Sequence, residues 1–183
     1  MQITDLLQLP QIQLHSTAAD LPAAVHTLCG LLAQGDAVQD AALLEQDVLA
    51  RLAQGCICMG NGLAVPHAKT AAVSRAALAA ITLDKPMDCP TPDGEPVDLL
   101  FLIAAPEGEN DLHIRVLSSL AGLLVDKAFC RTLAAAQTPE QFRACIAEKE
   151  NAEPPQPQPK KGRHIRLLAV TACPNGLAHT YMA

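Results

Sequence analysis

Hydrophobic residues recur at helical spacing in four segments of the chain. These segments are 16–36, 40–55, 110–126 and 138–150. The first two each run out at a glycine, which is typical of a helix end. We expect Ser16 or Thr17 to cap the first helix and Thr138 to cap the last.

Three shorter runs are almost entirely apolar, which is typical of strands buried on both faces of a sheet. These runs are 63–65, 76–83 and 97–105. Pro66 favours extended geometry at Val65, and the turn sequence TPDGEP separates the last two runs. Because helices are mixed with buried strands, we expect an α/β fold: a three-layer α/β/α sandwich with a mixed central sheet flanked by helices.

The composition changes near residue 150, where four prolines occur among few apolar residues. This composition predicts an extended, semi-stiff linker. Beyond it, Ile165–Thr171 has the pattern of a strand, and a Cys-Pro-Asn-Gly turn and the opening of a helix follow. A strand and half a helix cannot bury a core. We therefore expect a main domain over 1–148, a Pro-rich linker over 149–163 and an incomplete second domain over 164–183.

Composition and charge exclude several classes of protein. The chain is 50% hydrophobic with a net charge of −6, and its first 150 residues contain no basic run, so we expect no nucleic-acid partner. Its start lacks the pattern of a signal peptide, and its apolar runs are too short to cross a bilayer. The seven cysteines show no framework spacing. We therefore expect a cytoplasmic protein with reduced thiols and no membrane insertion.

Candidate chemistry centres on the ten residues Gly60–Lys69, GNGLAVPHAK. Backbone N–H groups of a glycine loop can form an anion-binding concavity, and a strand ending at Pro66 would hold the His67 imidazole with little freedom. This combination suits a nucleophile that carries an oxyanion group. The alternative is that His67 is a turn residue or a half-buried polar group without a chemical role.

GNGLAVPHAK resembles the active-site signature of the enzyme IIA domains of the fructose/mannitol class, in the bacterial phosphoenolpyruvate-dependent sugar phosphotransferase system. The resemblance runs over about residues 1–148 and includes a second block, GEPVDLLFLIAAPEGENDLHIRVLSSLAGLL. Members of this family have an arginine sixteen positions before the histidine and a second histidine forty-six positions after it. In this chain these positions are Arg51 and His113.

The resemblance implies that His67 accepts a phosphoryl group from the histidine-containing phosphocarrier protein. Arg51 would present a fork of donors to the phosphoryl oxygens, and His113 would donate to the same oxygens. A helix N-terminus near Asn110 would add a favourable dipole. The alternatives are that Arg51 is a solvated arginine on a helix face and that His113 is a polar residue near a helix start, neither with a role in phosphoryl transfer. No cofactor and no metal are expected.

The tail sequence VTACPNGLAHTYMA resembles the phosphocysteine loop of a fructose-class enzyme IIB domain, with Cys173 as its cysteine. This implies a phosphoryl relay from His67 to a cysteine of enzyme IIB, and a membrane enzyme IIC that takes up fructose, with mannosylglycerate as a second choice. Because the chain given ends at Ala183, we expect the tail to be a truncated start of the domain and Cys173 not to function within it.

Two other functions stay open. Related IIA domains of the nitrogen-type branch are regulatory phosphoswitches, although a IIB-like tail has no use in such a switch. The second is a metal site formed by Cys56, Cys58, His67 and His113. Its Cys-x-Cys pair lacks the two-residue gap of zinc knuckles. We also expect Glu107, Glu109 and Asp111 to form an acidic rim for the phosphocarrier.

Overall fold

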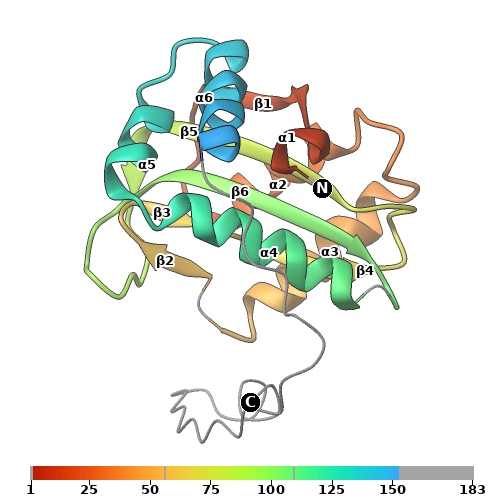
Figure 1. Cartoon of the computed structure of the whole chain (residues 1–183). Coiled ribbons are helices and arrows are strands. Elements are labelled where there is room, and N and C mark those ends of the chain that lie inside the picture. The colour runs from red at the N-terminus through yellow and green to blue at the C-terminus, as the bar shows by residue number, and fades with distance from the viewer. Residues whose placement is uncertain (1, 56, 109, 153–183) are drawn as a thin grey trace, which may run out of the picture. The chain divides into compact units, whose positions relative to one another are not determined.

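The computed structural model describes residues 2–55, 57–108 and 110–152 (Figure 1). Its helices are α1 (Ile3–Leu6), α2 (Leu21–Leu32), α3 (Ala41–Leu52), α4 (Asn110–Leu124), α5 (Lys127–Ala134) and α6 (Pro139–Ala152). Its strands are β1 (Leu7–Ser16), β2 (Cys58–Gly60), β3 (Leu63–Ala64), β4 (His67–Thr70), β5 (Ala77–Met87) and β6 (Val97–Pro106). Residues 153–183, which include most of the predicted linker and the incomplete second domain with Cys173, lie outside the described residues.

The strands form one mixed sheet in the order β1-β5-β6-β3-β2, and β4 also pairs with β6. β5 and β6 are antiparallel, whereas β3 and β4 run parallel to β6 along the same edge. β3 and β4 share one register, because Leu63 faces Leu99 and His67 faces Ile103. Pro66 lies between them and has no N–H to donate, so the strand is interrupted directly before His67.

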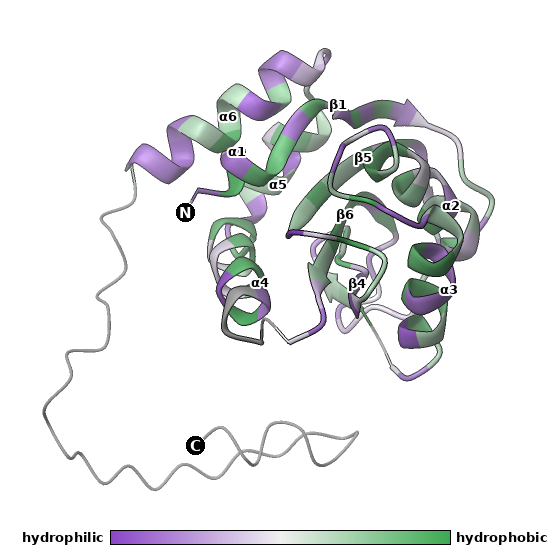
Figure 2. Cartoon of the chain, turned by 90° about the vertical axis from the view of Figure 1, so that its right-hand side faces the viewer, coloured by the Kyte–Doolittle hydropathy of each residue, from purple (hydrophilic) through white to green (hydrophobic). Residues whose placement is uncertain are grey.

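Helices cover both faces of the sheet, which confirms the predicted three-layer sandwich. α2 and α3 pack on one face, and α1, α4, α5 and α6 pack on the other. Figure 2 shows the two helical layers on either side of the hydrophobic strands β5 and β6. Both of these strands are buried over most of their length, as their apolar sequences predict.

The first strand was not among the predicted elements. In β1 the alternation of apolar and polar residues changes phase between Leu9 and Ile12, where the pairing with β5 also shifts register. Pro10 is tolerated there because β1 is an edge strand that pairs only with β5. The predicted cap at Ser16 or Thr17 is wrong, because Ser16 ends this strand. Asp20 caps α2 instead, and its carboxylate accepts a hydrogen bond from the Ala23 N–H at 2.9 Å.

The predicted helix over 110–126 is α4, which ends two residues earlier than expected, and a further helix, α5, follows it. α5 was not among the predicted elements, and Asp126 caps it. The Asp126 carboxylate accepts hydrogen bonds from the N–H groups of Ala128 at 2.9 Å and Phe129 at 3.2 Å. The last helix begins as predicted, with the Thr138 hydroxyl accepting from the Gln141 N–H at 3.2 Å.

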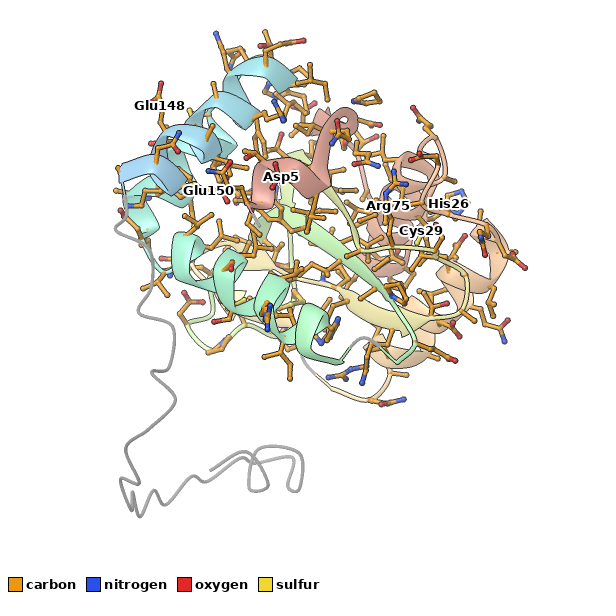
Figure 3. All side chains as sticks on the ribbon, turned by 45° about the vertical axis from the view of Figure 1, so that its right-hand side comes forward. Asp5, His26, Cys29, Arg75, Glu148 and Glu150 are labelled. Carbon is orange, nitrogen blue, oxygen red and sulfur yellow. A yellow bond between two sulfur atoms is a disulfide. The ribbon has the colours of Figure 1, made fainter. Side chains whose placement is uncertain are left out.

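The last helix, α6, continues to Ala152, four residues beyond the predicted boundary between domain and linker at residue 148. The Glu150 carboxylate accepts hydrogen bonds from the backbone N–H groups of Ile3 and Thr4 and from the Thr4 hydroxyl at 2.8 Å. Figure 3 shows Glu150 on the side of α6 that faces α1. These charge-assisted bonds hold the last turn of α6 against the N-terminus, so residues 149–152 belong to the folded domain.

We expect Glu150→Gln to lower the stability of the domain, because an amide cannot accept from all of these donors. Part-buried hydrogen bonds to a charged group contribute about 1.5–3 kcal/mol, which for a domain of this size lowers the melting temperature by roughly 3–10 °C. Thermal unfolding followed by circular dichroism measures the change. Glu148→Gln, at an exposed position of the same helix, is the control. Equal melting temperatures for the two variants would contradict the assignment.

The structure joins Cys58 and Cys89 in a disulfide, so the expectation that all cysteines are reduced is wrong for this pair. The two residues are 31 positions apart, and only the folded sheet brings β2 close to the loop that follows β5. Cys29 and Cys130 are free and buried, and burial raises their pKa values to about 12 and about 11. Within the described residues, no helix is long and apolar enough to span a bilayer.

Candidate functional site

The His67 imidazole is held in one tautomer by the backbone. His67 is the first residue of β4 and is half-buried, and its Nδ1 lies 2.9 Å from the Val65 carbonyl oxygen. A carbonyl can only accept a hydrogen bond, so Nδ1 carries the proton. Nε2 therefore keeps its lone pair and is the nucleophilic atom of this ring.

His113 lies beside His67, as expected from the resemblance to the family and its spacing of forty-six positions. It belongs to the first turn of α4, is only 9% exposed, and has its ring centroid 5.6 Å from that of His67. Its Nδ1 is buried and has no hydrogen-bond partner among the described residues. Buried polar atoms in native proteins are almost always paired, so this unpaired nitrogen close to the His67 ring indicates a place for a polar ligand.

Arg51 completes the predicted set. It lies in the last turn of α3, which packs against β4. Because β4 pairs only with β6, α3 can bring Arg51 around the open edge of the sheet to the two histidines. Its positive charge acts on both imidazoles. Cys173, the fourth predicted site residue, lies outside the described residues.

Burial and positive charge keep both imidazoles neutral near pH 7. The pKa of His67 is lowered first by burial and then by Arg51, against the opposing effect of the Val65 hydrogen bond. The pKa of His113 is lowered to about 4, first by burial and then by the charges of His67, Lys69 and Arg51. A neutral His67 can act as a nucleophile, and a neutral His113 can donate one hydrogen bond.

We expect the buried neutral His113 to make the protein less stable in acid. Its pKa is about 6.5 in the unfolded chain and about 4 in the folded protein, so the unfolded state binds the proton more tightly. The contribution of His113 to the unfolding free energy is therefore constant above about pH 6.5. It falls by up to about 3 kcal/mol as the pH drops from 6.5 to 4.

Urea unfolding of the protein and of His113→Gln between pH 7.5 and 4 measures this effect. The unfolding free energy of the variant should depend less steeply on pH, since glutamine does not titrate. Lys85→Gln, at an exposed position on β5, is the control and should keep the full pH dependence. Parallel curves for the protein and His113→Gln would contradict the low pKa.

The glycine loop does not form the expected anion-binding concavity beside His67. Gly60, Asn61 and Gly62 form the turn between β2 and β3, and all three have positive φ angles. The Asn61 N–H donates to the Asp93 carboxylate at 2.7 Å, and the Gly62 carbonyl accepts from the Asp98 N–H at 2.9 Å. The turn is therefore occupied by contacts within the protein.

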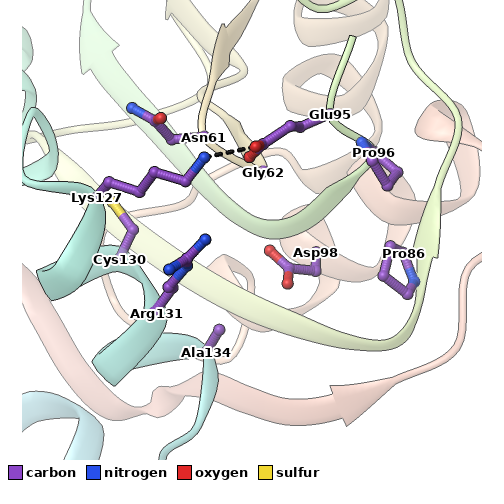
Figure 4. Close-up of a pocket in the computed structure, with 10 residues that line it drawn as sticks. All are labelled: Asn61, Gly62, Pro86, Glu95, Pro96, Asp98, Lys127, Cys130, Arg131 and Ala134. Carbon is purple, nitrogen blue, oxygen red and sulfur yellow. Dashed lines mark hydrogen bonds and ion pairs between the residues drawn. The ribbon is translucent and has the colours of Figure 1, made fainter. Parts of the chain in front are cut away.

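Glycine is required at this turn by close contacts as well as by backbone angles. A Cβ atom on Gly62 would lie 2.7 Å from the Asp98 carboxylate. A side chain at this position would therefore force the carboxylate or the turn to move. The turn borders a cavity of about 210 Å³ near the start of β6 (Figure 4). Asp98 and Ile103, the residue that faces His67, are five positions apart on β6, or roughly 16 Å. The cavity is therefore separate from the His67 site.

The alternative of a metal site has no support in the structure. Cys58 is bonded to Cys89, and Cys56 lies outside the described residues. In the part of the chain that the structure describes, no group of three or more His, Cys, Asp or Glu residues could hold a metal ion.

The acidic rim is only partly described by the structure. Glu107 is exposed directly after β6. Glu109 lies outside the described residues, and the structure describes Asp111 by its backbone alone.

Two groups at the site were not predicted from the sequence. The sequence could not identify the Val65 carbonyl as part of the site, because every residue has a backbone carbonyl. Lys69 could have been found, because residues i and i+2 of a strand point to the same side of the sheet. His67 and Lys69 are the more accessible residues of β4, whereas Ala68 and Thr70 are buried.

Comparison with known proteins gives the family. Residues 5–149 match the family described as phosphoenolpyruvate-dependent sugar phosphotransferase system, EIIA 2. The whole chain is 34% identical to the 2-O-alpha-mannosyl-D-glycerate-specific EIIABC component of Escherichia coli over 185 residues, and 34% identical to the fructose-specific EIIABC component of Bacillus subtilis over 188 residues. The chain spans only 28% and 30% of the lengths of these two relatives.

A solved structure supports the same assignment. The nitrogen regulatory protein IIA-Ntr from Neisseria meningitidis aligns with a TM-score of 0.72 and 30% identity, over 79% of this chain and 98% of that protein. The mixed sheet between two helical layers, with Arg51, His67 and His113 at one edge, thus occurs in a chain whose sequence matches this family over most of its length. The chain belongs to the EIIA type-2 family of the phosphoenolpyruvate-dependent sugar phosphotransferase system, and its folded domain is a phosphotransfer domain of that family.

Proposed function

We propose that His67 carries the phosphoryl group, on its Nε2 atom. The observation that carries this proposal is the hydrogen bond of 2.9 Å between Nδ1 and the Val65 carbonyl, which leaves Nε2 as the free nucleophilic nitrogen. The lowered pKa of His67 supports it, because the ring is neutral and can attack throughout the physiological pH range.

In the transfer, the Nε2 lone pair of His67 forms a bond to phosphorus while the bond from phosphorus to the donor nitrogen breaks. The donor imidazole keeps the electron pair of that bond. Such transfers depend mainly on positioning and on stabilising the charge of the phosphoryl oxygens. Arg51 supplies a fork of N–H donors and His113 supplies one N–H from the first turn of α4, where the helix dipole also favours an anion.

We propose the histidine-containing phosphocarrier protein as the donor. The exposed Ile114, 46% accessible and next to His113, offers it an apolar contact, and Glu107 begins the acidic rim predicted from the sequence. Complementary charge mainly raises the association rate, so neutralising Glu107 together with Glu109 and Asp111 should slow phosphorylation most at low salt.

We propose enzyme IIB as the acceptor, in a system with a membrane enzyme IIC that takes up fructose or a glycoside such as mannosylglycerate. The support is the extent of the two alignments: both EIIABC relatives match the whole chain, which includes residues 153–183. Residues 164–183 are then the beginning of a IIB domain, with Cys173 in its phosphocysteine loop. The alignment with IIA-Ntr, by contrast, covers only 79% of the chain.

The similarity to IIA-Ntr favours a second candidate function, a regulatory phosphoswitch. The test is to phosphorylate the protein with phosphoenolpyruvate, enzyme I and the phosphocarrier, and then to add a separate fructose-class IIB domain. A sugar-transport role predicts rapid loss of phosphate from His67 to IIB, and no loss when the IIB cysteine is replaced by serine. Phosphate that stays on His67 in both cases would favour the regulatory role.

A further inference from the structure

β4 presents two side chains toward the candidate phosphoryl site. Its four residues alternate between accessible and buried, with His67 and Lys69 on the more accessible side. Side chains two residues apart in a strand leave the backbone about 7 Å from each other and in the same direction. A lysine side chain is long enough to bridge that distance, so its Nζ can reach a group bound to His67.

The electrostatics of His113 independently place Lys69 near the site. The charge of Lys69 is among those that lower the pKa of His113, together with the charge of Arg51. His113 comes from α4 and Arg51 from α3, so the influence of Lys69 extends to the residues that surround His67 from other elements.

The charge of the bound group favours more than one cation at the site. A phosphoryl group on a side chain carries about two negative charges near pH 7. Arg51 supplies one positive charge, and both imidazoles are neutral. Since the site is half-buried and charges interact more strongly there than in water, a second cation would stabilise the phosphorylated state considerably.

We propose that Lys69 is a second cationic ligand of the phosphoryl group on His67, which it binds through Nζ. This rests on the proposed function of His67. The Nζ of Lys69 donates hydrogen bonds to the phosphoryl oxygens. The bond changes are those given above, between phosphorus and the two imidazole nitrogens, and no further reactant is needed.

Three variants test this role: Lys69→Met, which removes the charge and keeps the length, Lys69→Arg, which keeps the charge, and Lys85→Met as the control. Lys85 is exposed near the far end of β5. At saturating phosphocarrier, Lys69→Met should take up phosphate roughly 10- to 100-fold more slowly. Lys69→Arg should stay within a few-fold of the original protein, and Lys85→Met should not change the rate.

Two further measurements separate binding of phosphate from docking and from general structure. NMR titration of the unphosphorylated protein should show that the pKa of His113 is higher in Lys69→Met than in the original protein. The pKa of His113 should not change in Lys69→Arg or Lys85→Met. The phosphorylated Lys69→Met protein should also lose its phosphate by hydrolysis faster than the original protein.

The outcomes distinguish this inference from the proposed function. If the original protein takes up no phosphate on His67, the proposed function fails and the role of Lys69 fails with it. If the original protein is phosphorylated and Lys69→Met reaches the same rate at saturating phosphocarrier, only the role of Lys69 is overturned. A change confined to the phosphocarrier concentration needed would assign Lys69 to docking, and would also overturn the proposal.

Discussion

We expect His67→Ala to abolish phosphate uptake. The other imidazole of the described site, His113, is only 9% exposed and is therefore less accessible to a phosphoryl donor than the half-buried His67. The measurement is intact mass after incubation with phosphoenolpyruvate, enzyme I and the phosphocarrier. The original protein should gain one phosphate that is labile in acid and stable in alkali, and the variant should gain none.

The position of the phosphate on the ring is part of the same prediction. Nδ1 is occupied by the Val65 carbonyl, so NMR of the phosphorylated protein should show the phosphorus on Nε2. His26→Ala is the control, because His26 is exposed on α2 and pairs with Glu45 at 3.0 Å. Stoichiometric phosphate on His67→Ala would show that another residue is the acceptor.

We expect Arg51→Ala to slow phosphate uptake by roughly a hundred- to thousandfold, or about 3–4 kcal/mol of transition-state stabilisation. The guanidinium presents several N–H donors in a fixed plane, which matches the geometry of phosphoryl oxygens. Arg51→Lys should recover only part of this loss, because an ammonium replaces the charge without the fork. Rapid-quench kinetics with radiolabelled phosphocarrier measures the rate at saturating donor.

Arg75→Lys is the matched control for Arg51→Lys. Arg75 is exposed and forms a surface ion pair with Asp36, and such pairs contribute little to stability. Its replacement should therefore leave both the rate and the melting temperature unchanged. If Arg51→Lys is as active as the original protein, the fork geometry is not needed and Arg51 contributes only a charge.

Hydrophobic periodicity predicted most of the framework, because helices and buried strands leave distinct patterns in a sequence. The strands that became β5 and β6 read as apolar runs, since both faces of each are covered by helices. The edge strand β1 was missed because its alternation changes phase between Leu9 and Ile12, and because Ser16 is also a favourable residue for a helix cap. The helix α5 was missed because its eight residues are too few for a helical period to stand out in the sequence.

The motif and its spacings selected three residues that the structure brings to one edge of the sheet. The structure did not support the expected role of the glycine turn, because the Asn61 N–H donates to Asp93 and the Gly62 carbonyl accepts from the Asp98 N–H. A glycine-rich turn next to a histidine in sequence need not be next to it in space, because the intervening strand β3 carries the chain away.

The sequence alone determined the family, the α/β layers and the identity of His67, Arg51 and His113 as candidates, because each of these depends on residue type and spacing along the chain. Only the tertiary structure decided which His67 nitrogen is free, since that depends on the Val65 carbonyl and on the break in the strand at Pro66. It also decided that both imidazoles are neutral, because burial and the approach of cations from other elements fix a pKa.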